Sequence, residues 1–163
     1  MPRRTLVVAI VLLSIVLVAA VLASSFLPRN TPSGSSSGNP PGNPQCSGTA
    51  ACFRDTATYI VDGDTLDVGS TRIRLTLVNS PEVGEPGYSE AKNFTAQTCP
   101  VGSQALVDED DGQTSGSYGR MVAVVYCGGV NLNAALLSSG NAVLVEYYCS
   151  VSEFASEPWT GCP

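Results

Sequence analysis

Polar residues that could bind a cation lie in two segments with hydrophobic runs. Asp62 and Asp64 flank Gly63 in IVDGDTLDV, and Asn79 and Ser80 follow the apolar residues of IRLTLVNSPE. Carboxylate, amide and carbonyl oxygens are hard ligands that suit Ca²⁺. The two segments therefore predict a calcium site if folding brings them together, although an Asp-Gly pair is more commonly only a hairpin turn.

Three charged residues near these segments could act on a phosphodiester. Arg74 precedes Asn79 on the same run, Glu82 follows it, and Arg120 comes after Ser-Tyr-Gly. A guanidinium group matches phosphate oxygens, and a carboxylate near a metal can take a proton from water. Oxygen ligands, one base and two arginines together predict a phosphodiester hydrolase site. Alone, an arginine in a strand is usually a solvated surface charge.

Short apolar runs predict the strands that must position these residues. Residues 56–61 and 65–69 read as a hairpin around the Asp-Gly pair. The run STRIRLTLV alternates with a period of two, so it predicts a strand with Ile73, Leu75 and Leu77 on one face and Arg72, Arg74 and Thr76 on the other. SQALVDED and RMVAVVYC predict two further strands.

Two helices are predicted between and after these strands. Residues 89–97 suit a short helix capped by Ser89, with Ala91, Phe94 and Thr98 facing inward. NLNAALLSSG predicts a second helix, which an Asn caps and Gly140 closes. Many short strands with one helix inserted midway favour a small β-barrel with helices, an α+β fold.

The N-terminal part of the chain differs from the rest in composition. Thr5 to Ala23 is almost entirely apolar behind MPRR, which predicts a membrane anchor in residues 1–27, with a cleaved signal as the alternative. Arg3 and Arg4 should then stay in the cytoplasm and the remainder outside. Residues 28–45 are rich in Pro, Gly and Ser and predict a linker, so the folded domain spans residues 46–163.

All six cysteines fall within residues 46–163, and an even number in an exported domain indicates disulfides. Six cysteines allow 15 pairings. One hypothesis is that each bond joins cysteines that follow one another in the sequence. It pairs Cys46 with Cys52, Cys99 with Cys127, and Cys149 with Cys162. Zinc is the competing interpretation, and the lack of histidine and of a CxxC pair argues against it.

The same part of the chain is strongly acidic. It holds five basic and all 14 acidic residues, so its net charge is 5 minus 14, or −9. Such a surface repels phosphate backbones at long range. The densest acidic run, residues 108–111, is predicted to be a solvated turn, with an accessory cation site as the alternative.

Five segments, in this order, resemble the staphylococcal nuclease family, also called thermonucleases: IVDGDTLDV, IRLTLVNSPE, GYSEAKNF, SYGRMVAVVY and VNLNAALLSSGNAVL. They cover roughly residues 56–148. The resemblance implies a five-stranded OB-fold barrel with helices packed at one side, here stabilised by disulfides. It also implies a Ca²⁺-dependent phosphodiesterase that acts on DNA and RNA.

The resemblance also implies roles for individual residues. Asp64 matches a calcium ligand, Asn79 stands where the family usually has a second carboxylate, and Ser80 matches a residue that offers its backbone carbonyl. Asp62 matches an acidic neighbour of the metal. Glu82 matches the general base, Arg74 and Arg120 match the pair that binds the scissile phosphate, and Tyr118 and Tyr148 match aromatic residues that line the nucleotide pocket.

The chain departs from the family pattern in three features that bear on calcium binding, substrate binding and the C-terminal segment. Asn79 keeps an oxygen but removes a negative charge, which should weaken Ca²⁺ binding. No lysines surround the SYGR turn, and the C-terminal helix looks shortened by Pro158, where a bond between Cys149 and Cys162 could replace helix packing.

The sequence thus predicts an exported Ca²⁺-dependent nuclease with a nucleic acid substrate, either tethered to the cell membrane or secreted. Its oligomeric state is open, with a monomer as the expectation. The alternatives are a non-catalytic OB-fold module that binds a nucleic acid strand or a protein, and a disulfide-rich structural domain of the envelope.

Overall fold

The computed structural model describes residues 46–163. The anchor predicted in residues 1–27 and the linker predicted in residues 28–45 lie outside the described residues and stay predictions. Among the residues that the structure describes, no helix has both the length and the apolar character needed to cross a membrane.

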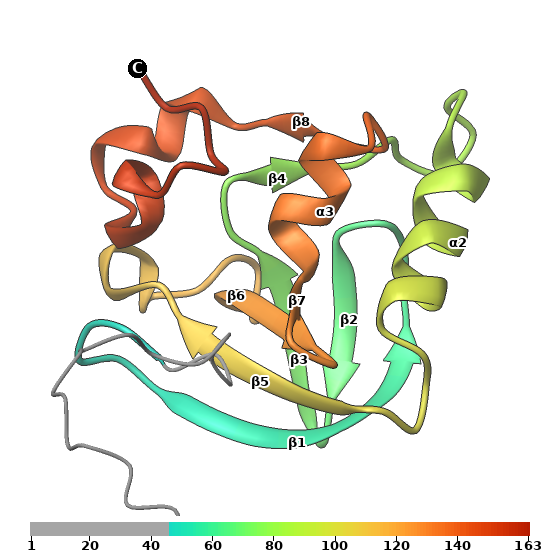
Figure 1. Cartoon of the computed structure of the whole chain (residues 1–163), viewed down its shortest axis with the longest axis horizontal. Helices are drawn as coiled ribbons and strands as arrows, with labels where there is room; N and C mark the ends of the chain where they lie inside the picture. The colour runs from blue at the N-terminus through green and yellow to red at the C-terminus, as the bar shows by residue number, and fades with distance from the viewer. Residues whose placement is uncertain (1–45) are drawn as a thin grey trace, which may run out of the picture. The chain divides into compact units, whose positions relative to one another are not determined.

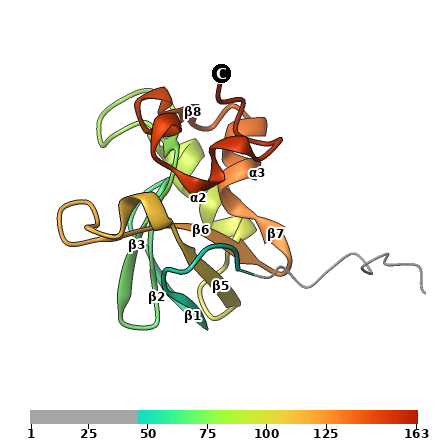
Figure 2. The ribbon, with the colours of Figure 1, turned by 90° about the vertical axis from the view of Figure 1, so that its left-hand side faces the viewer.

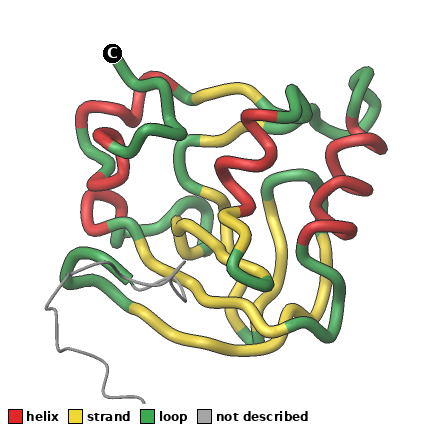
Figure 3. Tube along the Cα trace, viewed as in Figure 1, coloured by secondary structure: helices red, strands yellow, loops and turns green. Residues whose placement is uncertain are grey.

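The described residues form eight strands, two α-helices and several short 3₁₀ turns (Figures 1 and 3). The strands are β1 (Cys52–Ile60), β2 (Thr65–Val68), β3 (Thr71–Leu75), β4 (Val78–Asn79), β5 (Gln104–Glu109), β6 (Met121–Cys127), β7 (Val130–Asn131) and β8 (Val143–Leu144). The helices are α2 (Tyr88–Thr98) and α3 (Leu132–Ser138), and the 3₁₀ turns are η2 (Asp111–Gln113), η3 (Glu146–Ser150) and η4 (Glu153–Ser156).

Five of the strands form a closed barrel. Their order is β3-β2-β1-β5-β6, every neighbouring pair is antiparallel, and a parallel pairing of β3 with β6 closes the ring. Closure leaves no exposed edge among these strands. The predicted five-stranded OB-type barrel is therefore confirmed.

The barrel encloses the main hydrophobic core, to which β1, β2, β3, β5, β6 and α3 all contribute buried side chains. Helix α3 packs against β6, and α2 packs against α3 (Figure 2). One polar residue of α3 joins the helix to the barrel: the amide of Asn133 accepts a hydrogen bond from the Val125 N–H and donates to the carbonyls of Thr76 and Ala123. A fully buried Asn thus joins α3 to the middle of β6.

The helix starts differ in how well the sequence predicts them. The cap of α3 is confirmed, because the Asn131 side chain accepts a hydrogen bond from the Ala134 N–H. The Ser89 cap is wrong: α2 begins at Tyr88, after Gly87 with φ of 91°, and no side chain caps it. Gly87 turns the chain in a left-handed conformation, so the helix starts before Ser89 is reached.

The single strand predicted from STRIRLTLV, residues 70–78, is interrupted. Residues Thr76 and Leu77 form a turn between β3 and β4, and Leu77 has φ of 60°. Ile73 and Leu75 enter the barrel core, but Leu77 packs in a second cluster with Val124 and Phe154. The expectation that all three apolar residues share one face is therefore wrong, because strict alternation needs an unbroken strand.

The acidic run 108–111 is not the predicted solvated turn. Asp108 and Asp110 are buried, with 2% and 0% of their surface exposed. The Asp110 carboxylate accepts hydrogen bonds from the Thr76 hydroxyl, the Gln113 amide and the backbone N–H of Glu153, among others. It therefore joins the end of β3 to the C-terminal segment.

All three predicted cysteine pairs are present. The bond between Cys149, which lies in η3, and Cys162 closes a loop that contains η4. The covalent bond thus holds the segment that carries Tyr148.

We expect the double replacement of Cys149 and Cys162 by Ser to lower the free energy of unfolding by about 2–4 kcal/mol, because the unfolded chain regains the entropy of the open loop. Urea unfolding followed by circular dichroism measures this loss. The matched control replaces Cys46 and Cys52, which are six residues apart rather than 13, so the loss should be smaller. A larger loss for the control pair would contradict the argument.

Candidate active site

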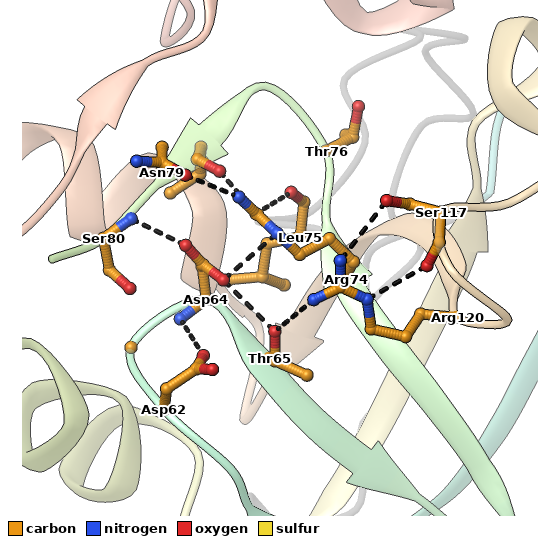
Figure 4. A network of polar contacts seen from close by, with 12 residues as sticks. Asp62, Asp64, Thr65, Arg74, Leu75, Thr76, Asn79, Ser80, Ser117 and Arg120 are labelled. Atoms are coloured by element: carbon orange, nitrogen blue, oxygen red, sulfur yellow. Dashed lines mark hydrogen bonds and ion pairs between the residues drawn. The ribbon is translucent and has the colours of Figure 1, made fainter. Parts of the chain in front are cut away.

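Asp64 joins the start of β2 to the end of β4. Its carboxylate is buried, and it accepts hydrogen bonds from the Ser80 N–H at 2.6 Å and from the Thr65 hydroxyl at 3.2 Å. The Arg74 Nε lies 3.2 Å from Oδ1 of Asp64 (Figure 4). The Asp64 N–H in turn donates to Asp62 at 3.1 Å. The two segments singled out in the sequence therefore meet at this carboxylate.

Gly63 makes that meeting possible. A Cβ built at this position would lie 2.6 Å from the Ser80 Cβ and 2.7 Å from the Ala91 Cβ. Gly63 has no positive φ, so it is needed for close approach and not for a left-handed hairpin turn. The Thr95 hydroxyl of α2 donates to the Gly63 carbonyl and holds the loop against the helix.

We expect Gly63→Ala to lower the free energy of unfolding by about 1–3 kcal/mol, because the added methyl group overfills a closely packed contact. Thermal or urea unfolding measures the change. Ser89→Ala serves as the control: Ser89 is exposed and caps nothing, so its loss should change stability by no more than about 0.5 kcal/mol. Equal stability of the two variants would refute the packing argument.

Arg74 is held by four acceptors. Besides the contact with Asp64, its Nη1 donates to the carbonyls of Leu75 and Val78, and its Nη2 donates to Oδ1 of Asn79 at 3.0 Å. Burial lowers the pKa of Arg74, whereas the negative charge of Asp64 opposes that shift. An arginine has so high an ordinary pKa that it stays charged here at neutral pH. The guanidinium is thus fixed in orientation before any ligand binds.

Arg120 also reaches the residues around Asp64, because it contacts Thr65. A tight turn precedes it: Ser117 pairs with Arg120, and between them Tyr118 and Gly119 have φ of 53° and 75°. Two positive φ values fit a type I′ turn. The Arg120 guanidinium donates to the Ser117 carbonyl at 3.0 Å and to the Thr65 hydroxyl at 3.3 Å.

Thr65 and Ser117 are site residues that the sequence motifs did not single out. The Thr65 hydroxyl contacts both Asp64 and Arg120, and Ser117 offers its carbonyl and its hydroxyl to Arg120. Their positions next to Asp64 and Tyr118 in the sequence could have identified them as site residues. Both residues orient the charged groups.

Most of the predicted site residues line one cleft of about 470 Å³. Those on its wall are Arg74, Asn79, Glu82, Tyr118, Arg120 and Tyr148. Asp62, Asp64 and Ser80 are not among its lining residues, and Asp64 connects to the cleft through Arg74. The structure thus gathers the two arginines, the proposed base and the two tyrosines around one hollow.

Glu82 is the one acidic side chain on the wall of this cleft. It is exposed, and its backbone N–H donates to the Glu85 carboxylate at 2.8 Å. Within residues 46–163, no hydrogen bond or ion pair holds the Glu82 carboxylate itself. Its charge acts on Arg74, whose pKa it raises as a minor contribution. The carboxylate can therefore contact water in the cleft.

The oxygen atoms available near Asp64 are of the chemical types that bind calcium. They are the carboxylates of Asp62 and Asp64, the amide oxygen of Asn79 and the carbonyl of Ser80, all hard ligands. Burial, followed by the charge of Asp64, raises the pKa of Asp62. No group of three His, Cys, Asp or Glu side chains suited to a metal occurs in the part of the chain that the structure describes. Arg74 already contacts Asp64 and Asn79, so a cation would share these acceptors with it.

The protein is a closed OB-type barrel with two arginines and one carboxylate on a single cleft. The family described as staphylococcal nuclease homologue matches residues 72–157, which include Arg74, Asn79, Glu82 and Arg120. The chain belongs to this family.

Two relatives support the assignment. The chain is similar to a micrococcal nuclease of Shigella flexneri, with 34% identity over 112 residues that cover 60% of this chain and 62% of that protein. It is also similar to an uncharacterized protein of Bacillus anthracis, with 27% identity over 95 residues that cover 53% of this chain and 44% of that protein. The chain thus spans less than two thirds of the length of either relative.

Proposed function

We propose that this protein is an extracytoplasmic, calcium-dependent nuclease that hydrolyses phosphodiester bonds in DNA, RNA or both. The observation that carries the proposal is the convergence on one cleft of Arg74, Arg120 and the Glu82 carboxylate, which no described residue binds. A pure binding module has no use for such a base. Family membership and the similarity to a micrococcal nuclease add to this support.

The reaction follows from the positions of these side chains. Arg74 and Arg120 bind the non-bridging oxygens of the phosphate and stabilise the charge that grows there. Glu82 accepts a proton from a water molecule, whose oxygen forms a bond to phosphorus while the ester bond on the opposite side breaks. The departing oxygen takes a proton from solvent. Tyr118 and Tyr148 contact the sugar and base on the walls of the cleft.

Asp64, Asn79 and the Ser80 carbonyl would hold the calcium ion, with Asp62 as an acidic neighbour. Bound calcium supplies a positive charge that polarises the phosphate. Before calcium binds, Arg74 contacts the Asp64 and Asn79 oxygens and offsets the charge of this acidic pocket.

The test is cleavage of labelled single-stranded DNA and RNA by the full chain with millimolar Ca²⁺ or with a chelator. We expect cleavage with calcium and none with the chelator. No cleavage at millimolar calcium, with the strand still bound, would replace the proposal by the non-catalytic binding module. The net charge of −9 over residues 46–163 favours that second candidate, because it weakens long-range attraction to nucleic acid.

The proposed location rests on the sequence of residues 1–45 and on the three disulfides. Residues 1–27 would anchor the protein in the cell membrane, or be removed on secretion, and leave the domain outside as a monomer. Protease added to intact cells should digest the domain if it is tethered outside. Protection of the domain until the cells are lysed would refute the extracytoplasmic location.

We expect Asn79→Asp to strengthen calcium binding by about one order of magnitude, because affinity rises with the number of charged ligands. Calorimetric titration of calcium into the full chain measures this without reference to activity. Asn93→Asp is the matched control, since Asn93 is exposed on α2 and belongs to no part of the site. Unchanged affinity in the Asn79 variant would exclude this residue from the calcium site.

A further inference from the structure

An exposed pair of tyrosines stands at the edge of the cleft. Tyr147 and Tyr148 are neighbours in η3, with 83% and 39% of their surfaces exposed. Tyr148 lines the cleft, and Tyr147, which has no part in the family resemblance, does not. Tyrosine is one of the residues that contribute most binding energy where two molecules meet.

The Tyr147 ring nevertheless has a defined contact. It meets the Tyr148 ring edge to face, with 5.1 Å between the ring centroids and 84° between the planes. Edge-to-face contact is a favoured geometry for two aromatic rings. Because Tyr148 forms part of the cleft wall, the Tyr147 ring lies directly beside that wall.

The backbone under this pair is also held in place. The Val151 and Ser152 N–H groups donate to the Tyr148 carbonyl, and the Tyr148 N–H donates to Val145. The disulfide of the adjacent Cys149 ties the segment to Cys162. A ring on a fixed backbone loses little conformational entropy when a ligand stacks on it.

The acidic net charge of residues 46–163 is the reason why an uncharged aromatic contact would matter for binding nucleic acid. Residues 46–163 carry a net charge of −9, and their five basic residues include only two that line the cleft. Attraction to a phosphate backbone is therefore weak beyond the scissile phosphate. Stacking between a base and an aromatic ring needs no charge and works for any base.

We propose that Tyr147 is a base-stacking residue, which binds an unpaired nucleobase next to the nucleotide whose phosphate lies between Arg74 and Arg120. This inference rests on the proposed function and adds a subsite outside the cleft. The ligand is a single strand of at least two nucleotides, because a base inside a duplex does not offer its face to the ring.

The experiment compares two substrates of the full chain: a single-stranded oligonucleotide, and a p-nitrophenyl ester of one nucleotide, which has no neighbouring base. Tyr147→Ala should raise KM for the oligonucleotide about 10-fold with kcat retained, and it should leave both constants for the ester unchanged. Tyr147→Trp should keep the wild-type KM. The matched control is Tyr59→Ala, since Tyr59 is 55% exposed on β1 and does not line the cleft.

Three results would overturn the inference: an unchanged KM for the oligonucleotide, an equal change for the ester, or an equal change in the Tyr59 variant. If the wild-type chain cleaves neither substrate, the proposed function fails, and the stacking role is then decided by fluorescence anisotropy with a labelled oligonucleotide. About 10-fold weaker binding by Tyr147→Ala would still support it. Equal binding by both chains, or no binding by either, would reject it.

Discussion

Glu82→Gln is expected to lower kcat for the cleavage of single-stranded DNA by about 10²–10⁴-fold, the usual contribution of a general base. Glutamine has nearly the shape of glutamate but cannot accept the proton of the attacking water. Because Glu82 is exposed and its carboxylate is bound to no other described residue, the change should leave the fold intact. Steady-state kinetics at saturating calcium, with a melting curve for each variant, measure both effects.

A second variant tests whether a loss of activity comes from proton transfer or from net charge. Glu90→Gln removes one negative charge from an exposed position in the first turn of α2, away from the cleft wall. Its kcat should stay near the wild-type value. If both variants lost activity equally, net charge and not proton transfer would be responsible. If Glu82→Gln kept full activity, another group would have to act as the base.

Arg120→Lys is expected to lower kcat/KM by about 10²–10³-fold, the loss seen when one donor to a transition-state oxyanion is removed. The planar guanidinium can bond to Ser117 and Thr65 and still present N–H groups to a phosphate. A lysine ammonium keeps the charge but not this geometry. The measured loss therefore separates hydrogen-bond geometry from charge.

Stability is the second readout for this variant. Arg120 forms hydrogen bonds with hydroxyl and carbonyl groups and lies over the exposed Tyr118 ring, but it forms no ion pair among the described residues. Its replacement should therefore leave the melting temperature nearly unchanged. Arg74 would be a poorer probe, because its loss leaves the buried Asp64 without an ion pair. Arg54→Lys is the control, as Arg54 is exposed on β1 and does not line the cleft. Equal losses in both lysine variants would contradict a specific role for Arg120.

Local patterns predicted most elements of the fold correctly. The hairpin of β1 and β2, strands β5 and β6, and the Asn131 cap of α3 follow from apolar periodicity and from capping, which depend on residues a few positions apart. The three disulfides join the cysteines paired by sequence order. The barrel itself followed from the order of elements and from the family resemblance.

The predictions from sequence were wrong for residues whose environment depends on a distant part of the chain. Asp110 looked like part of a solvated turn, but it is buried because Thr76 and Glu153 both donate to it. Gly63 looked like a turn former, but it is required by the approach of Ser80 and Ala91.

By itself, the sequence determined which residues could do chemistry and on which strand or loop each one lies, since these properties are local. Only the tertiary structure decided that Arg74 contacts Asp64 and Asn79, that Thr65 links Asp64 to Arg120, and that the ring beside Tyr147 lines the cleft. The parallel pairing of β3 with β6 brings Arg120, which directly precedes β6, close to Arg74 and Thr65. That pairing joins strands almost fifty residues apart, and its register depends on packing across the whole barrel, which no short segment encodes.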